Sequence, residues 1–177
     1  MALDSDLVRV AVTGAVYVAP TSTSAPTTSS SALDVGFVDL GYVSADGIAE
    51  SIDRSTNQIR AWQNGSLVRE VTSEGTYSVS MTFIETSEAV LELYYGTTNA
   101  SGEFAIDPTS TGGRKSFVID VVDGATVERI YIPAGEITSL GERTLASGEA
   151  VGYEVTITAY ADAGSTTVTK WFSSLEA

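Results

Sequence analysis

The sequence predicts an all-β protein, an antiparallel β-sandwich or barrel flanked by one short α-helix. Three observations favour this class. Apolar and polar residues alternate strictly from Thr76 to Ile84, Asn-Gly and Asp-Gly pairs recur between apolar runs, and only one segment has helical spacing. The 177 residues and their 43% hydrophobic content suit one domain with a real core. We therefore expect residues 1–177 to form a single β-sandwich domain.

Residues 59–96 are expected to form a hairpin, a strand and a helix in one unbroken run. The hairpin turns at Asn64-Gly65, because these residues readily adopt the positive backbone angles of a type I′ turn. The strand over residues 76–84 buries one face and presents Ser and Thr on the other. A helix over about residues 86–95 follows, with Thr86 as the expected N-cap and Gly96 as the left-handed residue that ends it.

The segments before this run are also expected to be strands. Residues 7–18 alternate as a long first strand, in which Gly14 marks a bulge or a close approach of another backbone. Residues 35–51 are expected to form a second hairpin, which turns at Asp46-Gly47.

A third turn, Asp123-Gly124, is expected to join a strand over residues 116–122 to one over residues 126–132. The first of these strands is apolar on both faces, which is typical of a strand covered on both sides. We expect Pro133-Ala134-Gly135 to stop the second one. Strands over residues 151–161 and 166–172 then complete the sheet.

Residues 20–32 interrupt this pattern with a run of Ser, Thr, Pro and Ala that has no charge and no periodicity. Such a composition is typical of a flexible loop or linker. Structureless loops longer than about 12 residues inside a domain are usually functional or disordered. The segment is therefore a candidate for contacts with another molecule.

The charge of the chain restricts its partners. There are 23 acidic and 9 basic residues, which gives a net charge of −14. A surface this negative repels DNA and anionic membranes at long range, so stable binding through phosphate contacts is not expected. No run approaches the roughly 20 apolar residues of a membrane-spanning helix.

The absence of histidine and cysteine removes most catalytic chemistry. A Ser-His-Asp or Cys-His nucleophile, a histidine base, thiolate chemistry and the common zinc, haem and iron–sulfur ligand sets are all excluded. We expect no cofactor and no metal. Carboxylate pairs remain, because two Asp or Glu residues are enough for a glycosidase. The available pairs are Glu88 with Glu92, one helical turn apart, and Asp120 with Glu128, which are possible neighbours across two strands.

Three stretches within residues 35–96 resemble a known family. They are Phe37 to Ile48 (FVDLGYVSADGI), Ile59 to Arg69 with its Trp62-Gln63-Asn64-Gly65, and Thr82 to Thr86 leading to Leu93-Tyr94-Tyr95-Gly96. In this order they resemble the major tail protein, or tail tube protein, of long non-contractile-tailed bacteriophages, particularly those of actinobacterial hosts. The resemblance implies a β-sandwich with one flanking helix. It further implies a structural, non-enzymatic virion protein, made in the bacterial host cytoplasm.

The resemblance also implies how the subunit assembles. Copies would form hexameric rings that stack into a hollow tube, through which genomic DNA passes during ejection. The tape measure and tail terminator proteins would be further partners, and DNA contact would be transient and non-specific. No membrane contact is implied. An acidic, hydroxyl-rich lumen lets a polyanion slide, because phosphates find no cations there.

Two sets of residues are candidates for these roles. The first set is expected to face the lumen: Ser78, Ser80, Thr82, Glu154, Thr156 and Thr158. The second set is expected to contact a neighbouring subunit and to be mobile in the free one: Pro20, Thr21, Ser22, Thr23, Ser24, Ala25, Pro26, Thr27 and Thr28. An ordinary solvent-exposed sheet face would show the same alternation as the first set.

Two other classes of protein remain open from the sequence. A secreted or surface β-sandwich, such as an adhesive or fimbrial module, would share the acidic, Thr-rich composition, although the N-terminus lacks the basic region of a signal peptide. A carboxylate-only glycosidase would need an open cleft with two carboxyl groups about 5–10 Å apart.

Overall fold

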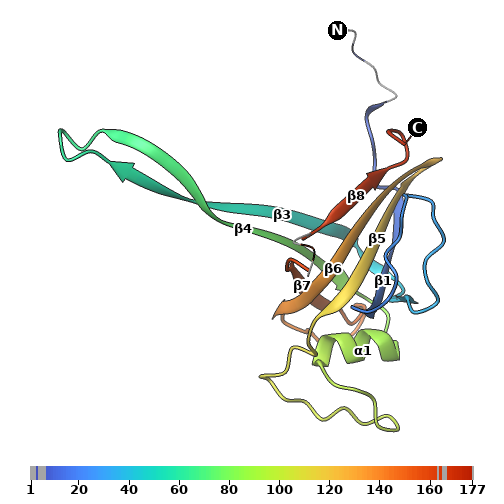
Figure 1. The fold of residues 1–177 in the computed structure, drawn as a ribbon. Coiled ribbons are helices and arrows are strands. Elements are labelled where there is room, and N and C mark those ends of the chain that lie inside the picture. The colour runs from blue at the N-terminus through green and yellow to red at the C-terminus, as the bar shows by residue number, and fades with distance from the viewer. Residues whose placement is uncertain (1–2, 4–6, 163, 165–166, 177) are drawn as a thin grey trace.

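A computed structural model shows a β-rich body from which one long hairpin projects (Figure 1). The structure describes residues 3, 7–162, 164 and 167–176. These residues form eight strands and one helix: β1 (Thr13–Pro20), β2 (Val38–Asp39), β3 (Val43–Arg60), β4 (Leu67–Phe83), α1 (Glu88–Tyr95), β5 (Lys115–Asp123), β6 (Thr126–Leu140), β7 (Tyr153–Ala159) and β8 (Thr169–Phe172).

All described strands belong to one antiparallel sheet, in the order β2-β1-β5-β6-β7-β4-β3, with β8 paired to β6 beside β7. The sheet folds over, because side chains from β1, β5 and β6 and side chains from β4 and β7 enter the same core. The predicted all-β class with a flanking helix is therefore confirmed. Among the residues that fill this core are Val16, Val18, Tyr77, Val79, Met81, Phe83, Phe117, Ile119, Ile130, Ile132, Tyr153, Val155 and Ile157.

The helix α1 closes one end of the core. Its N-cap is Ser87, one residue later than predicted, and its side chain accepts a hydrogen bond from the amide of Val90 at 3.4 Å. The C-cap Gly96 has a φ of 63°, the left-handed geometry that the sequence predicted. The buried side of the helix consists of Val90, Leu93 and Tyr94, whose hydroxyl donates to the carbonyl of Gly141.

Three segments differ from the sequence prediction. The pair Asp46-Gly47 does not turn the chain; it lies in a bulge of β3, where the register shifts between Val43 and Ile48. Likewise, β6 continues past Pro133, because Pro133 and Ala134 form a bulge opposite Ser116, where the missing amide proton is not needed. The strand predicted over residues 7–18 begins only at Thr13, which pairs with Val122 near the end of β5.

Gly14 marks a close approach of two backbones, as predicted. A Cβ at this position would lie 2.5 Å from the carbonyl oxygen of Asp120 on β5. The third turn, Asp123-Gly124, is also confirmed between β5 and β6. The strand expected to cover residues 166–172 is observed as β8 from Thr169, while Thr166 lies outside the described residues.

Candidate assembly surfaces

The six residues predicted to face a lumen lie on one face of the body. Along β4 and β7 these six residues alternate with buried core residues. Five of the six are half-buried, and Glu154 is exposed. The strands pair so that Ser78 lies opposite Thr158, Ser80 opposite Thr156 and Thr82 opposite Glu154. We call these six residues the hydroxyl face.

The hydroxyl face continues onto β6. The hydroxyl groups of Thr138 and Thr158 lie 2.7 Å apart, and Glu136 lies opposite Thr158 in the register. At its rim, Arg114 lies 3.9 Å from the Glu136 carboxylate and 4.4 Å above the ring of Tyr160. The six positions of the face itself carry hydroxyls and one carboxylate, so they offer no cation that would hold a phosphate.

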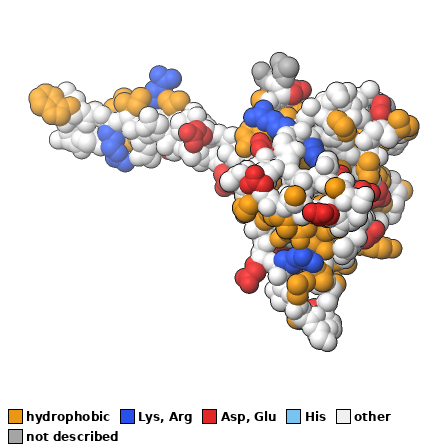
Figure 2. Space-filling model, turned by 90° about the horizontal axis from the view of Figure 1, so that it is seen from below, with side chains coloured by type: hydrophobic (Ala, Val, Ile, Leu, Met, Phe, Trp, Pro, Cys, Tyr) orange, Lys and Arg blue, Asp and Glu red, His pale blue; other side chains and the backbone are white. Residues whose placement is uncertain are grey.

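The projecting hairpin, which we call the arm, consists of residues 49–76 of β3, β4 and their turn (Figure 1). The turn residues Asn64 and Gly65 have φ values of 61° and 62°, as predicted. Both faces of the arm are exposed, so the burial that normally stabilises a hairpin is absent in the single subunit. Hydrophobic side chains remain exposed along it and at its far end (Figure 2): Ile52, Ile59, Trp62, Leu67, Val68 and Val71.

The arm and the body differ in charge. Residues 49–76 contain three arginines and four acidic residues, so all but one unit of the net charge of −14 belongs to the rest of the chain. The far end of the arm, residues 59–69, contains Arg60 and Arg69 and no carboxylate. We call residues 59–69 the tip. The hairpin turn was predicted from the sequence but the arm was not, because polar and apolar residues do not alternate along most of residues 49–76.

A lysine fixes the root of the arm to the body. Lys170 on β8 lies 2.5 Å from the carboxylate of Glu50 on β3 and 3.1 Å from that of Glu128 on β6. Burial and the neighbouring Glu50 carboxylate raise the pKa of Tyr77, on the strand where arm and body meet. This ion-paired cluster could not be predicted from the sequence, because its members lie on strands far apart in the chain.

The Ser/Thr/Pro loop over residues 20–32 packs on the outer face of the body. Its anchor is Arg129, which is 6% exposed and donates two hydrogen bonds of 2.7 Å to the carboxylate of Asp120. The same guanidinium donates to the carbonyls of Thr28 and Ser31 at 3.2 and 2.6 Å. The hydrogen bonds with Asp120 raise the pKa of Arg129.

The end of the chain adds a second anchor for this loop. The amide and the hydroxyl of buried Ser29 both donate to the carboxylate of Glu176 at 2.7 Å, which lowers the pKa of Glu176. The nine residues predicted to contact a neighbour therefore lie on an anchored loop, mostly exposed, with Pro26 buried. The loop explains why β5 is apolar on both faces: Val118 is fully buried on the side that faces away from the core.

The two predicted carboxylate pairs have other partners. Asp120 lies opposite Arg129 in the β5–β6 register, whereas Glu128 lies opposite Val121 and so points to the other face. On the helix, Glu88 and Glu92 both bind Asn99: Glu88 accepts from its side-chain amide at 2.7 Å and Glu92 from its backbone amide at 2.8 Å. Asp120 therefore binds an arginine, Glu128 binds Lys170, and Glu88 and Glu92 hold the loop at Asn99.

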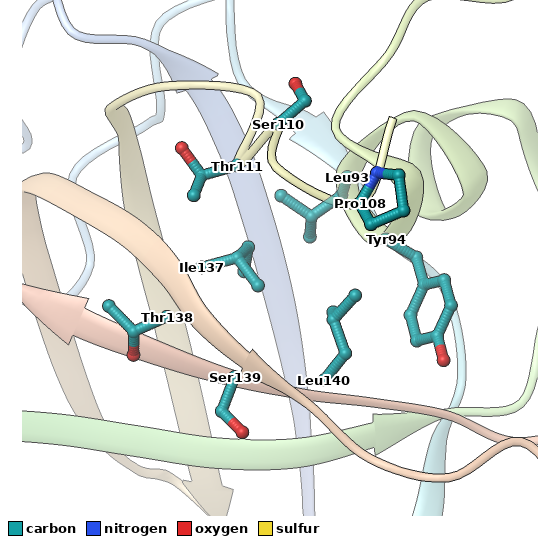
Figure 3. A pocket seen from close by; sticks show the side chains of 9 residues that line it. All are labelled: Leu93, Tyr94, Pro108, Ser110, Thr111, Ile137, Thr138, Ser139 and Leu140. Atoms are coloured by element: carbon teal, nitrogen blue, oxygen red, sulfur yellow. The ribbon is translucent and has the colours of Figure 1, made fainter. Parts of the chain in front are cut away.

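A small pocket lies between α1, the loop before β5 and β6 (Figure 3). It has a volume of about 240 Å³ and is lined by hydroxyl and apolar side chains, without an ionisable carboxylate. This pocket therefore lacks the two carboxyl groups of a glycosidase, whereas a larger cavity of about 690 Å³ is lined by Asp39, Glu88 and Glu92. Its lining residues are Leu93, Tyr94, Pro108, Ser110, Thr111, Ile137, Thr138, Ser139 and Leu140.

The described part of the chain shows neither a metal site nor a membrane helix. Among these residues, no group of three or more Asp and Glu side chains is placed to hold a metal ion. None of their helices has the length and apolar character needed to cross a membrane.

Comparisons with known proteins agree with this geometry. A family model described as phage tail tube protein matches residues 1–176. A comparison with curated proteins returns no match. Among solved structures, the chain is similar to the tube-terminating cap of an anti-feeding prophage, with a TM-score of 0.51, 14% identity and coverage of 96% of this chain and 98% of that chain.

A second similar structure comes from the sheath–tube complex of an extracellular contractile injection system in its extended state. Its TM-score is also 0.51, with 8% identity over 94% of this chain and 93% of that chain. At such low identity these two similarities show a shared fold. The predicted resemblance to tail tube proteins is confirmed by the family match.

Proposed function

Because this chain belongs to the phage tail tube protein family and is a structural component of the virion tail, we propose that its copies form stacked hexameric rings. The match over residues 1–176 is the observation that carries this proposal. In the proposed tube, the subunit contributes strength and a passage for DNA rather than catalysis. The tape measure and tail terminator proteins are its further partners.

The open edges of the sheet support assembly between copies. At one end of the strand order, β3 is 18 residues long and has an edge that pairs with no other described strand. Such an edge is an aggregation hazard in a monomer, and few lysines protect it here. Pairing with another copy satisfies those backbone groups, and a ring repeats the same contact until it closes.

We assign the hydroxyl face to the lumen and residues 20–28 to a contact between subunits. The hydroxyl face supports the first role, because its six positions offer no cation to DNA phosphates. The exposed side of the anchored loop supports the second role. Arg129 and Glu176 hold the end of this loop at Thr28, Ser29 and Ser31 within the single subunit, where the sequence had predicted a mobile segment. Less ordering entropy is therefore lost when it binds.

Negative-stain electron microscopy with light scattering, across a concentration series of the purified protein, tests this function. We expect rings or hollow tubes of uniform width, whose mass increases with protein concentration. Monomeric globular particles at every concentration would contradict self-assembly and would favour a surface β-sandwich module, for which a glycan-binding screen is the next measurement.

A further inference from the structure

We propose that the tip of the arm binds a trough between β1 and β3 on a second copy of the chain, with Trp62 inserted into the trough. This inference rests on the proposed function and identifies the surface that receives the arm. Four observations support it: the exposure of Trp62, the lining of the trough, the charges of the two surfaces and the length of β3.

Trp62 is the largest of the exposed hydrophobic side chains among the described residues. Its side chain is 96% exposed at the far end of the arm, with Leu67 and Val68 exposed behind it. Burying a tryptophan removes 150–250 Å² from water, and tryptophans often act as anchors at the centre of interfaces. An exposed tryptophan on a projecting element therefore indicates a partner that buries it.

The trough lies where the folded sheet leaves a gap between β1 and β3. Two adjoining cavities of about 390 and 420 Å³ share Gly14, Gly41 and Tyr42. The cavity of about 390 Å³ has an apolar lining, which is formed by Val12, Val16, Val43, Ile48 and Val121. Tyr42 is 75% exposed at the mouth of the trough, so an apolar surface is accessible there.

The charges of the tip and of the trough are complementary. Asp39 and Glu85 line the second cavity, and neither cavity is lined by a lysine or an arginine. Each carboxylate accepts one backbone hydrogen bond, from Gly41 and from Tyr42, and retains capacity for an arginine. The tip supplies Arg60 and Arg69 on either side of Trp62.

The occupant has to come from another molecule. Val43 to Ile48 at the trough and Arg60 at the tip belong to the two ends of the same strand, β3. An extended strand spanning residues 43–60 is about 55 Å long, so a tip cannot reach its own trough. A contact between opposite ends of one subunit is head-to-tail, and this kind of contact generates rings or helical tubes.

Disulfide trapping tests this contact, because the chain contains no cysteine. Gln63→Cys on the tip is mixed with Ala45→Cys at the trough, and oxidised dimers are measured on non-reducing gels. A matched mixture pairs Gln63→Cys with Ser147→Cys on an exposed loop. We expect at least several-fold more dimer from the first mixture, whereas equal yields would overturn the proposal.

A charge exchange tests the same contact in assembly. Arg60→Glu with Arg69→Glu is expected to raise the protein concentration needed for assembly by about tenfold. Adding Asp39→Arg and Glu85→Arg is expected to restore it, and Arg54→Glu on the shaft of the arm is the control. If the tip variant assembles like the unchanged protein, the trough is wrong while the tube function stands. If the unchanged protein never assembles, both fail.

Discussion

At the scale of single residues, Arg129 joins parts of the chain that are far apart in sequence. It binds Asp120 across β5 and β6 and the carbonyls of Thr28 and Ser31, about a hundred residues away. Arg129→Met would leave the mostly buried Asp120 carboxylate without a partner. We expect the free energy of unfolding to fall by about 3–5 kcal/mol, measured by urea denaturation.

The control for this change is Arg114→Met, because Arg114 is about half exposed and lies 3.9 Å from Glu136. Its loss should stay below about 1 kcal/mol. Adding Asp120→Asn to Arg129→Met should recover part of the lost stability, since the unpaired charge is removed. Equal losses in the two single variants would show that Arg129 does not anchor the loop.

The contribution of Glu176 to stability is expected to depend on pH. Hydrogen bonds from Ser29 lower the pKa of Glu176 below its ordinary value of 4.5. The ionised carboxylate therefore stabilises the fold above pH 4.5, and this contribution is lost as the pH falls through the lowered pKa. We expect Glu176→Gln to lower the melting temperature at pH 7, with the difference from the unchanged protein disappearing in acid.

The control for the pH experiment is Glu149→Gln, on an exposed loop. Its melting temperature should follow that of the unchanged protein at every pH. A Glu176→Gln difference that stayed constant from pH 7 to pH 3 would mean that the charge of Glu176 is not what anchors Ser29.

Residue patterns predicted local geometry better than distant contacts. The left-handed Gly96 and the turn at Asn64-Gly65 were correct, because each depends on the backbone of a few neighbouring residues. The close approach at Gly14 was also correct, but its partner, Asp120 on β5, could not be predicted. The roles of Arg129 and Lys170 could not be predicted. Their partners are set by the register of strands that only the folded sheet brings together.

At the scale of elements, the incorrect predictions assumed that every strand buries one face against the core. The Asp46-Gly47 pair predicted a hairpin, but β3 absorbs it as a bulge and continues to Arg60. Beyond Ala49 the strand leaves the body, so neither face is buried and no apolar alternation is required. At the N-terminus the opposite holds: the valines at 8, 10 and 12 show the spacing of a strand in the sequence, but they are exposed and β1 begins only at Thr13.

The orientation of the arm is an element-scale property that can be tested. Lys170→Met removes the ion pairs with Glu50 and Glu128 at the root of the arm. Because these groups are partly exposed, the subunit should lose no more than about 1 kcal/mol of stability. A less fixed arm loses more entropy when it binds, so the concentration needed for assembly should rise, as measured by light scattering.

Lys170→Arg is the matched control, because it keeps the positive charge at the root of the arm. It should assemble at a concentration closer to that of the unchanged protein than Lys170→Met does. If Lys170→Met assembled at the same concentration as the unchanged protein, the ion pairs would not orient the arm for assembly.

At the scale of the whole molecule, the fold class and the family were predictable, whereas the shape was not. Alternation of apolar and polar residues along a strand indicates which face packs on a core. The β-rich class and the hydroxyl face were therefore predictable from residues 76–84 and 153–159. The division into an acidic body and a nearly neutral arm depends on where β3 leaves the sheet. That point is set by β7, which pairs with β4 only from Tyr77 to Phe83.

DNA binding can test whether the hydroxyl face lines the lumen of the assembled tube. Ser80→Lys with Thr156→Lys places two cations opposite each other on the hydroxyl face. If that face lines the lumen, every subunit adds two phosphate-binding charges to the passage. We expect tubes that retain short duplex DNA at low salt, protect it from nuclease and release it as salt increases.

Ala146→Lys with Ser147→Lys adds the same charge on an exposed loop and serves as the control. Nuclease protection separates the two positions, because DNA held on the outside of a tube remains accessible to the enzyme. Labelled DNA is sedimented with the tubes before and after nuclease treatment. Protection in the Ser80→Lys/Thr156→Lys tubes alone would place the hydroxyl face inside, and equal digestion in both variants would place it outside, since a cation outside the passage can bind DNA but cannot enclose it.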